Sequence, residues 1–69
     1  MNPLIQELSK LLNQYGGQLP PLNERRQLWK AIAGTSNEDT LKVFKEYVDT
    51  NSGKIHSTLL AEIGKILYD

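Results

Sequence analysis

Three clusters of turn-forming residues divide this 69-residue chain into four stretches, and each stretch carries apolar residues at helical spacing. The clusters are rich in Gly, Pro, Asn or Ser and fall at 16–21, 34–37 and 49–53. Apolar residues that recur every third or fourth position mark one face of an amphipathic helix. The pattern predicts one small all-α domain spanning 1–69, a four-helix bundle or an orthogonal packing with short loops, its helices at about 3–15, 22–33, 36–49 and 54–67.

Length and composition restrict what such a domain can do. A chain this short buries only about 60% of the surface that its unfolded form exposes, so little structure is left over for a deep active site. No cysteine is present, so helix packing or oligomerisation must stabilise the fold without disulfides. Eight basic residues balance eight acidic ones, which argues against a general polyanion binder. No apolar run approaches the roughly 20 residues of a membrane span, so we expect a soluble, cytoplasmic protein with no membrane contact.

The first helix has clear signals at both ends. Asn2 is a suitable N-cap, and Pro3 suits the first helical position because its missing N–H is not needed there. Gly16 and Gly17 can adopt the positive φ that often ends a helix. Between these signals, the apolar residues that should face the core are Leu4, Ile5, Leu8, Leu11, Leu12 and Tyr15.

The second helix should begin between Pro21 and Glu24 and stop at Gly34. Arg25 falls within its apolar arc, so that side chain must lay its stem along apolar surface or pair with a carboxylate. The remaining residues of the arc, which should be buried, are Leu28, Trp29, Ile32 and Ala33.

The third helix is expected to start at a capping box formed by Thr35 and Glu38, in which each side chain satisfies the backbone N–H of the other residue. Its polar face holds two i,i+4 ion pairs, Glu38 with Lys42 and Lys45 with Asp49, worth about 0.2–0.5 kcal/mol each. Its apolar residues cover nearly half the circumference and are Leu41, Val43, Phe44, Tyr47 and Val48.

Two residues of the fourth helix are unusual for their positions, a glycine inside the helix and a histidine in its apolar arc. Gly64 lies at the edge of the apolar arc and costs about 1 kcal/mol relative to Ala, a cost that a close helix crossing would repay; a kink or a fraying last turn is the alternative. His56 falls within the arc near the first turn, where we expect a backbone carbonyl to satisfy its ring. The arc itself comprises Ile55, Leu59, Leu60, Ile63, Ile66 and Leu67.

The segment Asp49 to Gly53 resembles the start of an EF-hand calcium loop, but its spacing does not match. An EF-hand places glycine sixth and a bidentate Glu twelfth, because Ca²⁺ requires six to eight oxygen ligands. Here the glycine is fifth, the twelfth residue is Leu60, and the next carboxylate, Glu62, comes two positions later. The segment is better interpreted as a turn that connects two helices.

Catalytic and cofactor motifs are lacking in the sequence. His56 is the only histidine, and its neighbours Ser57 and Thr58 would point about 100° away from one another on a helix, too far for a nucleophile–base pair. We therefore expect no enzymatic activity, no catalytic residues, no cofactor and no metal site.

Elimination leaves binding to another protein as the leading hypothesis, with a regulatory or adaptor role. The partner would be a different protein or a second copy of the chain, which would make a homodimer, bound through an apolar helix face that four short helices cannot hide. The predicted partner-binding residues are Val43, Tyr47, Leu60, Gly64 and Tyr68, although these side chains could instead complete the monomer core. The alternative function is nucleic-acid binding or a transcription-associated role, with Arg25, Arg26 and Lys30 as phosphate contacts.

Overall fold

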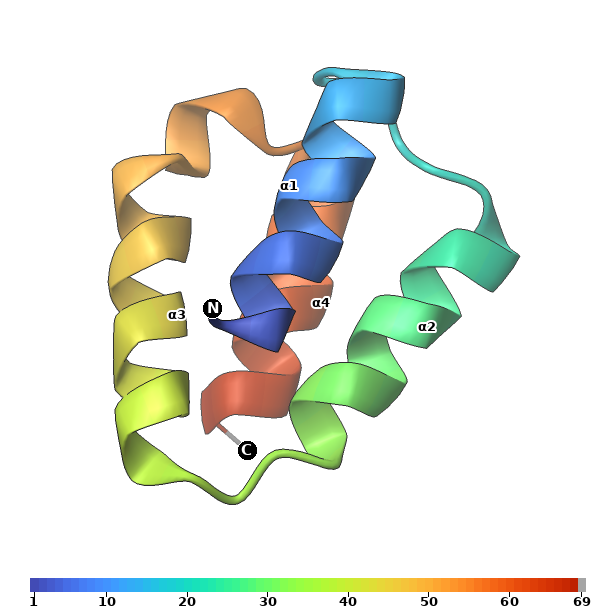
Figure 1. The fold of residues 1–69 in the computed structure, drawn as a ribbon. Helices are drawn as coiled ribbons and strands as arrows, with labels where there is room; N and C mark the ends of the chain where they lie inside the picture. Colours follow the sequence, from blue (N-terminus) through green and yellow to red (C-terminus); the bar gives the residue numbers. More distant parts are fainter. Residues whose placement is uncertain (69) are drawn as a thin grey trace.

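Helices make up most of the computed structural model, which describes residues 1–68 (Figure 1). They are α1 (Pro3–Tyr15), α2 (Leu22–Ala33), α3 (Glu38–Thr50), the short 3₁₀ helix η1 (Ser52–Lys54) and α4 (Ser57–Tyr68). The predicted all-α four-helix fold is confirmed. Within residues 1–68, no helix is both long enough and apolar enough to cross a membrane.

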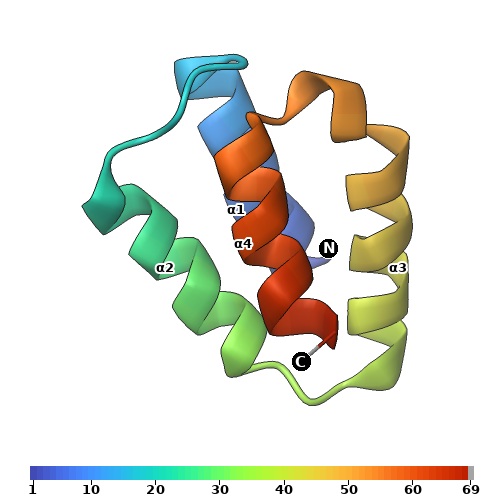
Figure 2. The same cartoon turned by 180° about the vertical axis from the view of Figure 1, so that it is seen from behind.

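Two helices lie in the middle of the fold and two lie on its flanks. α1 crosses in front of α4 in Figure 1 and behind it in Figure 2, while α2 and α3 lie on opposite sides of this pair in both views. α2 packs against both α1 and α4, and α3 also contacts both. The two flanking helices therefore present their outer faces in different directions.

A single hydrophobic core connects all four helices. Phe44 of α3 is fully buried among leucine and isoleucine side chains from the other helices. Ile55, which lies between η1 and α4 in extended backbone, is buried as well. The buried core consists of Leu4, Leu8, Leu11, Leu28, Ile32, Phe44, Val48, Ile55, Leu59 and Ile63.

The signals at the two ends of α1 are confirmed. Oδ1 of Asn2 accepts hydrogen bonds from the backbone N–H groups of Leu4 and Ile5, at 2.9 and 3.2 Å. At the other end, Gly16 adopts a φ of 61° and its N–H donates to the carbonyl oxygen of Leu12. Because residues with a Cβ rarely adopt this backbone conformation, the glycine ends the helix. The positive φ predicted for Gly17 is wrong, because only Gly16 has one among residues 1–68.

The predicted capping box at the start of α3 is wrong. The N-cap is Asn37, whose Oδ1 accepts from the N–H of Thr40 at 3.0 Å. The hydroxyl of Thr35 instead donates to the carbonyl oxygen of Ala31 at 2.7 Å, so this side chain belongs to the end of α2. Thr35 and Asn37 are both suitable N-caps and lie close together in the sequence. Because the Thr35 side chain bonds to the end of α2, Asn37 caps α3.

The fourth helix begins later than predicted. Its first residue is Ser57 rather than residue 54, because Ser52–Lys54 forms η1 and Ile55 is extended. His56 precedes the helix, and its Nδ1 accepts from the N–H of Thr58 at 3.1 Å, so the ring is bonded to a backbone donor and not to a carbonyl. The segment that resembles an EF-hand loop is a connector formed by the end of α3 and by η1.

Val43, which was predicted either to bind a partner or to complete the monomer core, is 47% exposed, so the core does not cover the whole apolar arc of α3. Two predictions about packing are wrong. Ala33, expected in the core, is exposed. A Cβ built on Gly64 would meet no heavy atom within 4 Å, so this glycine does not allow a close helix crossing.

The polar face of α3 also differs from the prediction. Within residues 1–68 the single salt bridge joins Arg25 to Glu62, and neither of the two i,i+4 pairs predicted on α3 is formed. Lys45 instead places its Nζ 5.0 Å from the centre of the Tyr68 ring on α4. Exposed i,i+4 pairs gain little energy, so a lysine in this position readily takes another contact.

Candidate functional site

The guanidinium of Arg25 joins α2 to α4. Its Nη1 donates to Oε2 of Glu62 at 2.7 Å, and its Nε donates to the carbonyl oxygen of Pro20 at 3.0 Å. The two side chains are only 14% and 25% exposed, so solvent screens this ion pair less than it screens a surface pair. Of the two alternatives predicted for Arg25, the structure shows the pairing with a carboxylate. The guanidinium carbon also lies 5.8 Å from the centre of the Trp29 ring, one helical turn away.

Beside this ion pair lies a hollow of about 500 Å³ between α2 and α4. Trp29, Ala33 and Ile66 give it apolar walls, and Lys30 and Lys65 bring exposed ammonium groups to it. Neither lysine has a salt-bridge partner among residues 1–68. We call this hollow the α2–α4 groove; it is lined by Trp29, Lys30, Ala33, Glu62, Lys65 and Ile66.

Two residues of the α2–α4 groove hold polar atoms without protein partners. Nε1 of Trp29 and Oε1 of Glu62 are both shielded from solvent, and neither forms a hydrogen bond with another described residue. A shielded donor or acceptor without a partner costs about 1–3 kcal/mol. The groove therefore contains polar atoms whose hydrogen-bonding capacity no described residue fills. The core has no such atoms, because no polar residue is buried in it among residues 1–68.

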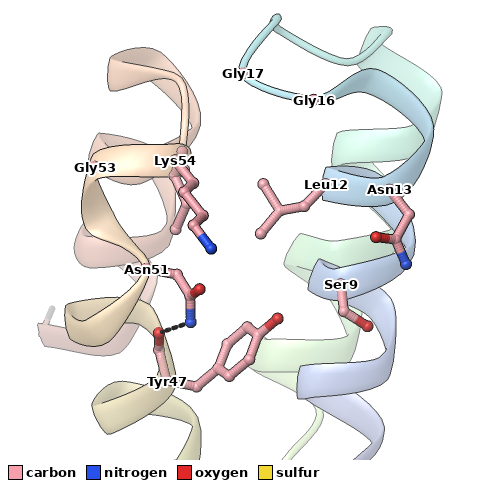
Figure 3. Close-up of a pocket in the computed structure, with 10 residues that line it drawn as sticks. Ser9, Leu12, Asn13, Gly16, Gly17, Tyr47, Asn51, Gly53 and Lys54 are labelled. Atoms are coloured by element: carbon pink, nitrogen blue, oxygen red, sulfur yellow. Dashed lines mark hydrogen bonds between the residues drawn. The ribbon is translucent and has the colours of Figure 1, made fainter.

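A second hollow, of about 480 Å³, lies between α1 and the end of α3 (Figure 3). Leu12 and Tyr47 point toward one another across it, and the side chain of Lys54 enters from η1. We call it the α1–α3 cleft; its lining residues are Ser9, Leu12, Asn13, Gly16, Gly17, Tyr47, Asn51, Gly53, Lys54 and Ile55. These residues include neither a carboxylate nor a histidine, so the cleft has no paired acid and base of the kind that hydrolytic and proton-transfer sites use.

The five predicted partner-binding residues do not form one surface. Tyr47 lines the α1–α3 cleft, on one flank of α3, whereas Tyr68 lies beside Lys45 on the flank that meets α4. Tyr68 is 67% exposed, and Val43 is exposed on the outer face of α3. Leu60 and Gly64 are half-buried on α4. The predicted partner-binding residues therefore lie on different sides of the flanking helix α3 and on α4.

The three residues predicted to contact nucleic acid are also divided. Arg25 is engaged by Glu62 and Pro20, so its guanidinium is not free for a phosphate. Arg26 and Lys30 remain exposed. Two free cations are few, because a nucleic-acid-binding protein typically makes about 6–10 phosphate contacts.

The α2–α4 groove escaped prediction from the sequence because Trp29, Ala33 and Ile66 were all assigned to the core. One feature of the sequence could have indicated that α2 and α4 pack side by side. Arg25 lies in an apolar arc and needs a carboxylate, and Glu62 is the one acidic residue of α4, so pairing the two would have placed α2 beside α4. The groove lies along that contact.

No candidate metal site is evident in the described part of the chain. Residues 1–68 contain no group of three His, Cys, Asp or Glu side chains that could hold a metal ion. Comparison of the chain with protein-family models, with curated proteins and with solved structures gives no significant match.

Proposed function

We propose that this chain is a non-enzymatic protein-interaction module of the regulatory or adaptor type, which works in the cytoplasm and binds a helix of its partner in the α2–α4 groove. The observation that supports this most directly is the combination of an apolar hollow with two lysines, at the same place, that have no salt-bridge partner among residues 1–68. Apolar surface supplies the affinity of such contacts, and charges around it select the partner.

The shape of the groove favours a helix as the occupant. Two helices that pack against each other leave a furrow along their line of contact, and an amphipathic helix can lay its apolar side chains into such a furrow. Ala33 is small and exposed between the larger Trp29 and Ile66, so it leaves room for an inserted side chain. Lys30 and Lys65 would favour a helix that carries acidic residues beside its apolar ones.

Site-specific photo-crosslinking in cells of the native host tests this proposal. A photoreactive residue replaces Ala33 inside the groove, and the matched control places it at Gln27, which is exposed on the same helix but does not line the groove. We expect a protein to be captured from Ala33 and not from Gln27. Equal capture from both positions, or capture from neither, would contradict the proposal.

The nucleic-acid alternative makes a different prediction. With Arg25 engaged, we expect the chain to show no retention on heparin or DNA at low salt, where phosphate contacts are strongest. Retention that falls steeply as salt is added, and that is lost in the double variant Arg26→Gln with Lys30→Gln, would favour the alternative.

A further inference from the structure

Exposed charges of opposite sign are separated between the flanking helices, although the chain as a whole has no net charge. On α2 and α4 every fully exposed charged side chain of the described residues is basic, and these are Arg26, Lys30 and Lys65. On α3 four of the five exposed charged side chains are acidic, namely Glu38, Asp39, Glu46 and Asp49, and the fifth is Lys42. α2 and α3 lie on opposite flanks of the molecule (Figures 1 and 2), so the basic and the acidic surface point in different directions.

The outer face of α3 also carries an apolar side chain where a groove could receive it. Val43 is 47% exposed, and the exposed Asp39 and Glu46 lie one turn before it and one turn after it on the same face. Asp39 and Glu46 are seven positions apart, which is about 10 Å along a helix with a rise of about 1.5 Å per residue. This face therefore offers one apolar side chain flanked by two negative charges.

The α2–α4 groove offers the complementary arrangement, namely apolar walls from Trp29, Ala33 and Ile66. It also has ammonium groups from Lys30 and Lys65, for which the described part of the chain supplies no salt-bridge partner. We propose that the groove binds α3 of a second copy of this chain, with Val43 inserted between α2 and α4 and with Asp39 and Glu46 paired to the two lysines. The proposal rests on the proposed function, because it names the helix that the groove binds.

The contact joins two different surfaces, so it is heterologous. The bound copy keeps its own groove free, and the first copy keeps its own α3 free. A contact of this kind adds further copies and forms open chains or rings instead of closing after two. Because charges supply much of the specificity, the association should be strongest at low ionic strength.

Sedimentation of the full chain over a range of concentrations tests the contact. At about 0.01 M salt, where the Debye length is about 30 Å, we expect the average mass to rise with concentration, and at about 1 M salt, where it is about 3 Å, we expect that rise to be lost. The variant Val43→Ser should weaken the association while leaving the charges unchanged. A strict monomer at millimolar concentration and low salt would overturn the proposal.

Charge reversal on each surface gives the sharper experiment. The groove variant carries Lys30→Glu and Lys65→Glu, and the α3 variant carries Asp39→Lys and Glu46→Lys. Each alone should associate at least about tenfold more weakly than the original chain, because it places like charges opposite one another. An equimolar mixture of the two should associate again, since each variant supplies the charges that the other now requires.

Controls separate this contact from a general effect of charge or folding. Lys10→Glu with Lys54→Glu makes the same change in net charge on α1 and η1, outside the groove, and should associate as the original chain does. The helical circular dichroism of each variant reports whether it is folded. A mixture of folded variants that stays monomeric would overturn the proposal. Capture of a different protein from Ala33, together with absent self-association, would overturn this inference and leave the proposed function standing.

Discussion

The side chain of Asn2 joins α1 to the backbone of α3 at Thr40. Its Oδ1 accepts from the first turn of its own helix, and its Nδ2 donates to the carbonyl oxygen of Thr40 at 3.0 Å. One carboxamide therefore both caps a helix and fixes its start against a neighbour that lies 38 residues away in the sequence.

Substitutions at Asn2 should separate its two roles. Asn2→Ala removes both and should lower the free energy of unfolding by about 1–2 kcal/mol. Asn2→Ser keeps a good capping oxygen but loses the donor to Thr40, so it should cost about 0.5–1.5 kcal/mol, the net value of one hydrogen bond. Urea denaturation at neutral pH measures both values. If Asn2→Ser is as stable as the original chain, the bond to Thr40 contributes nothing.

The ion pair between Arg25 and Glu62 should show strong coupling. Glu62→Ala leaves a largely buried guanidinium without its carboxylate and should cost about 1–3 kcal/mol. Arg25→Met keeps the apolar stem while removing the charge. The double variant should lose less than the two single losses added together, with a coupling energy of about 0.5–3 kcal/mol in a double-mutant cycle. Simple additivity would show that the pair is as weak as an exposed one.

Two glycines should respond to alanine in opposite directions. Gly64→Ala should raise the free energy of unfolding by up to about 1 kcal/mol, because the added Cβ meets no atom within 4 Å and alanine favours the helix. Gly16→Ala should lower it by about 1–3 kcal/mol, since a φ of 61° strains any residue with a Cβ. Thermal melting of both variants provides the comparison. A loss of stability in Gly64→Ala would indicate a contact at that position in solution.

Neighbouring residues of α3 should differ sharply in their sensitivity to truncation. Phe44→Ala empties the middle of the core and should cost about 3–5 kcal/mol, which is comparable to the whole stability of a domain this small. We expect that variant to be largely unfolded by circular dichroism. Val43→Ala, the adjacent control on the exposed face, should change stability by less than about 0.5 kcal/mol. A large effect at Val43 would mean that it is buried in solution.

Features that depend on the local chain could be predicted from the sequence. The cap at Asn2, the stop at Gly16 and the need of Arg25 for a carboxylate all follow from the chemistry of one residue and its near neighbours. The start of α3 could not be settled this way, because Thr35 and Asn37 are both good caps. The choice between them depends on how far α2 continues, and Thr35 bonds to α2.

Features that depend on how the helices are placed relative to one another could not be predicted. The apolar pattern of α3 includes Val43, but whether a neighbour covers that residue depends on the angle at which α3 meets the core. The same holds for Ala33 and Ile66, which were assigned to the core. Ala33 is exposed, while Ile66 packs against the core and also lines the α2–α4 groove. A helical arc gives the direction in which a side chain points, and the surrounding helices decide whether anything lies there.

The separation of exposed charge between α2 with α4 on one side and α3 on the other also bears on how the purified protein will behave. A neutral molecule with opposite charges on opposite flanks is an electric dipole, and at low ionic strength such molecules attract one another in solution. Added salt screens this attraction, so the solubility of the chain should rise when moderate amounts of salt are added, which is the salting-in behaviour of dipolar proteins. Dialysis into a buffer of very low ionic strength should therefore bring out turbidity that a modest addition of sodium chloride reverses.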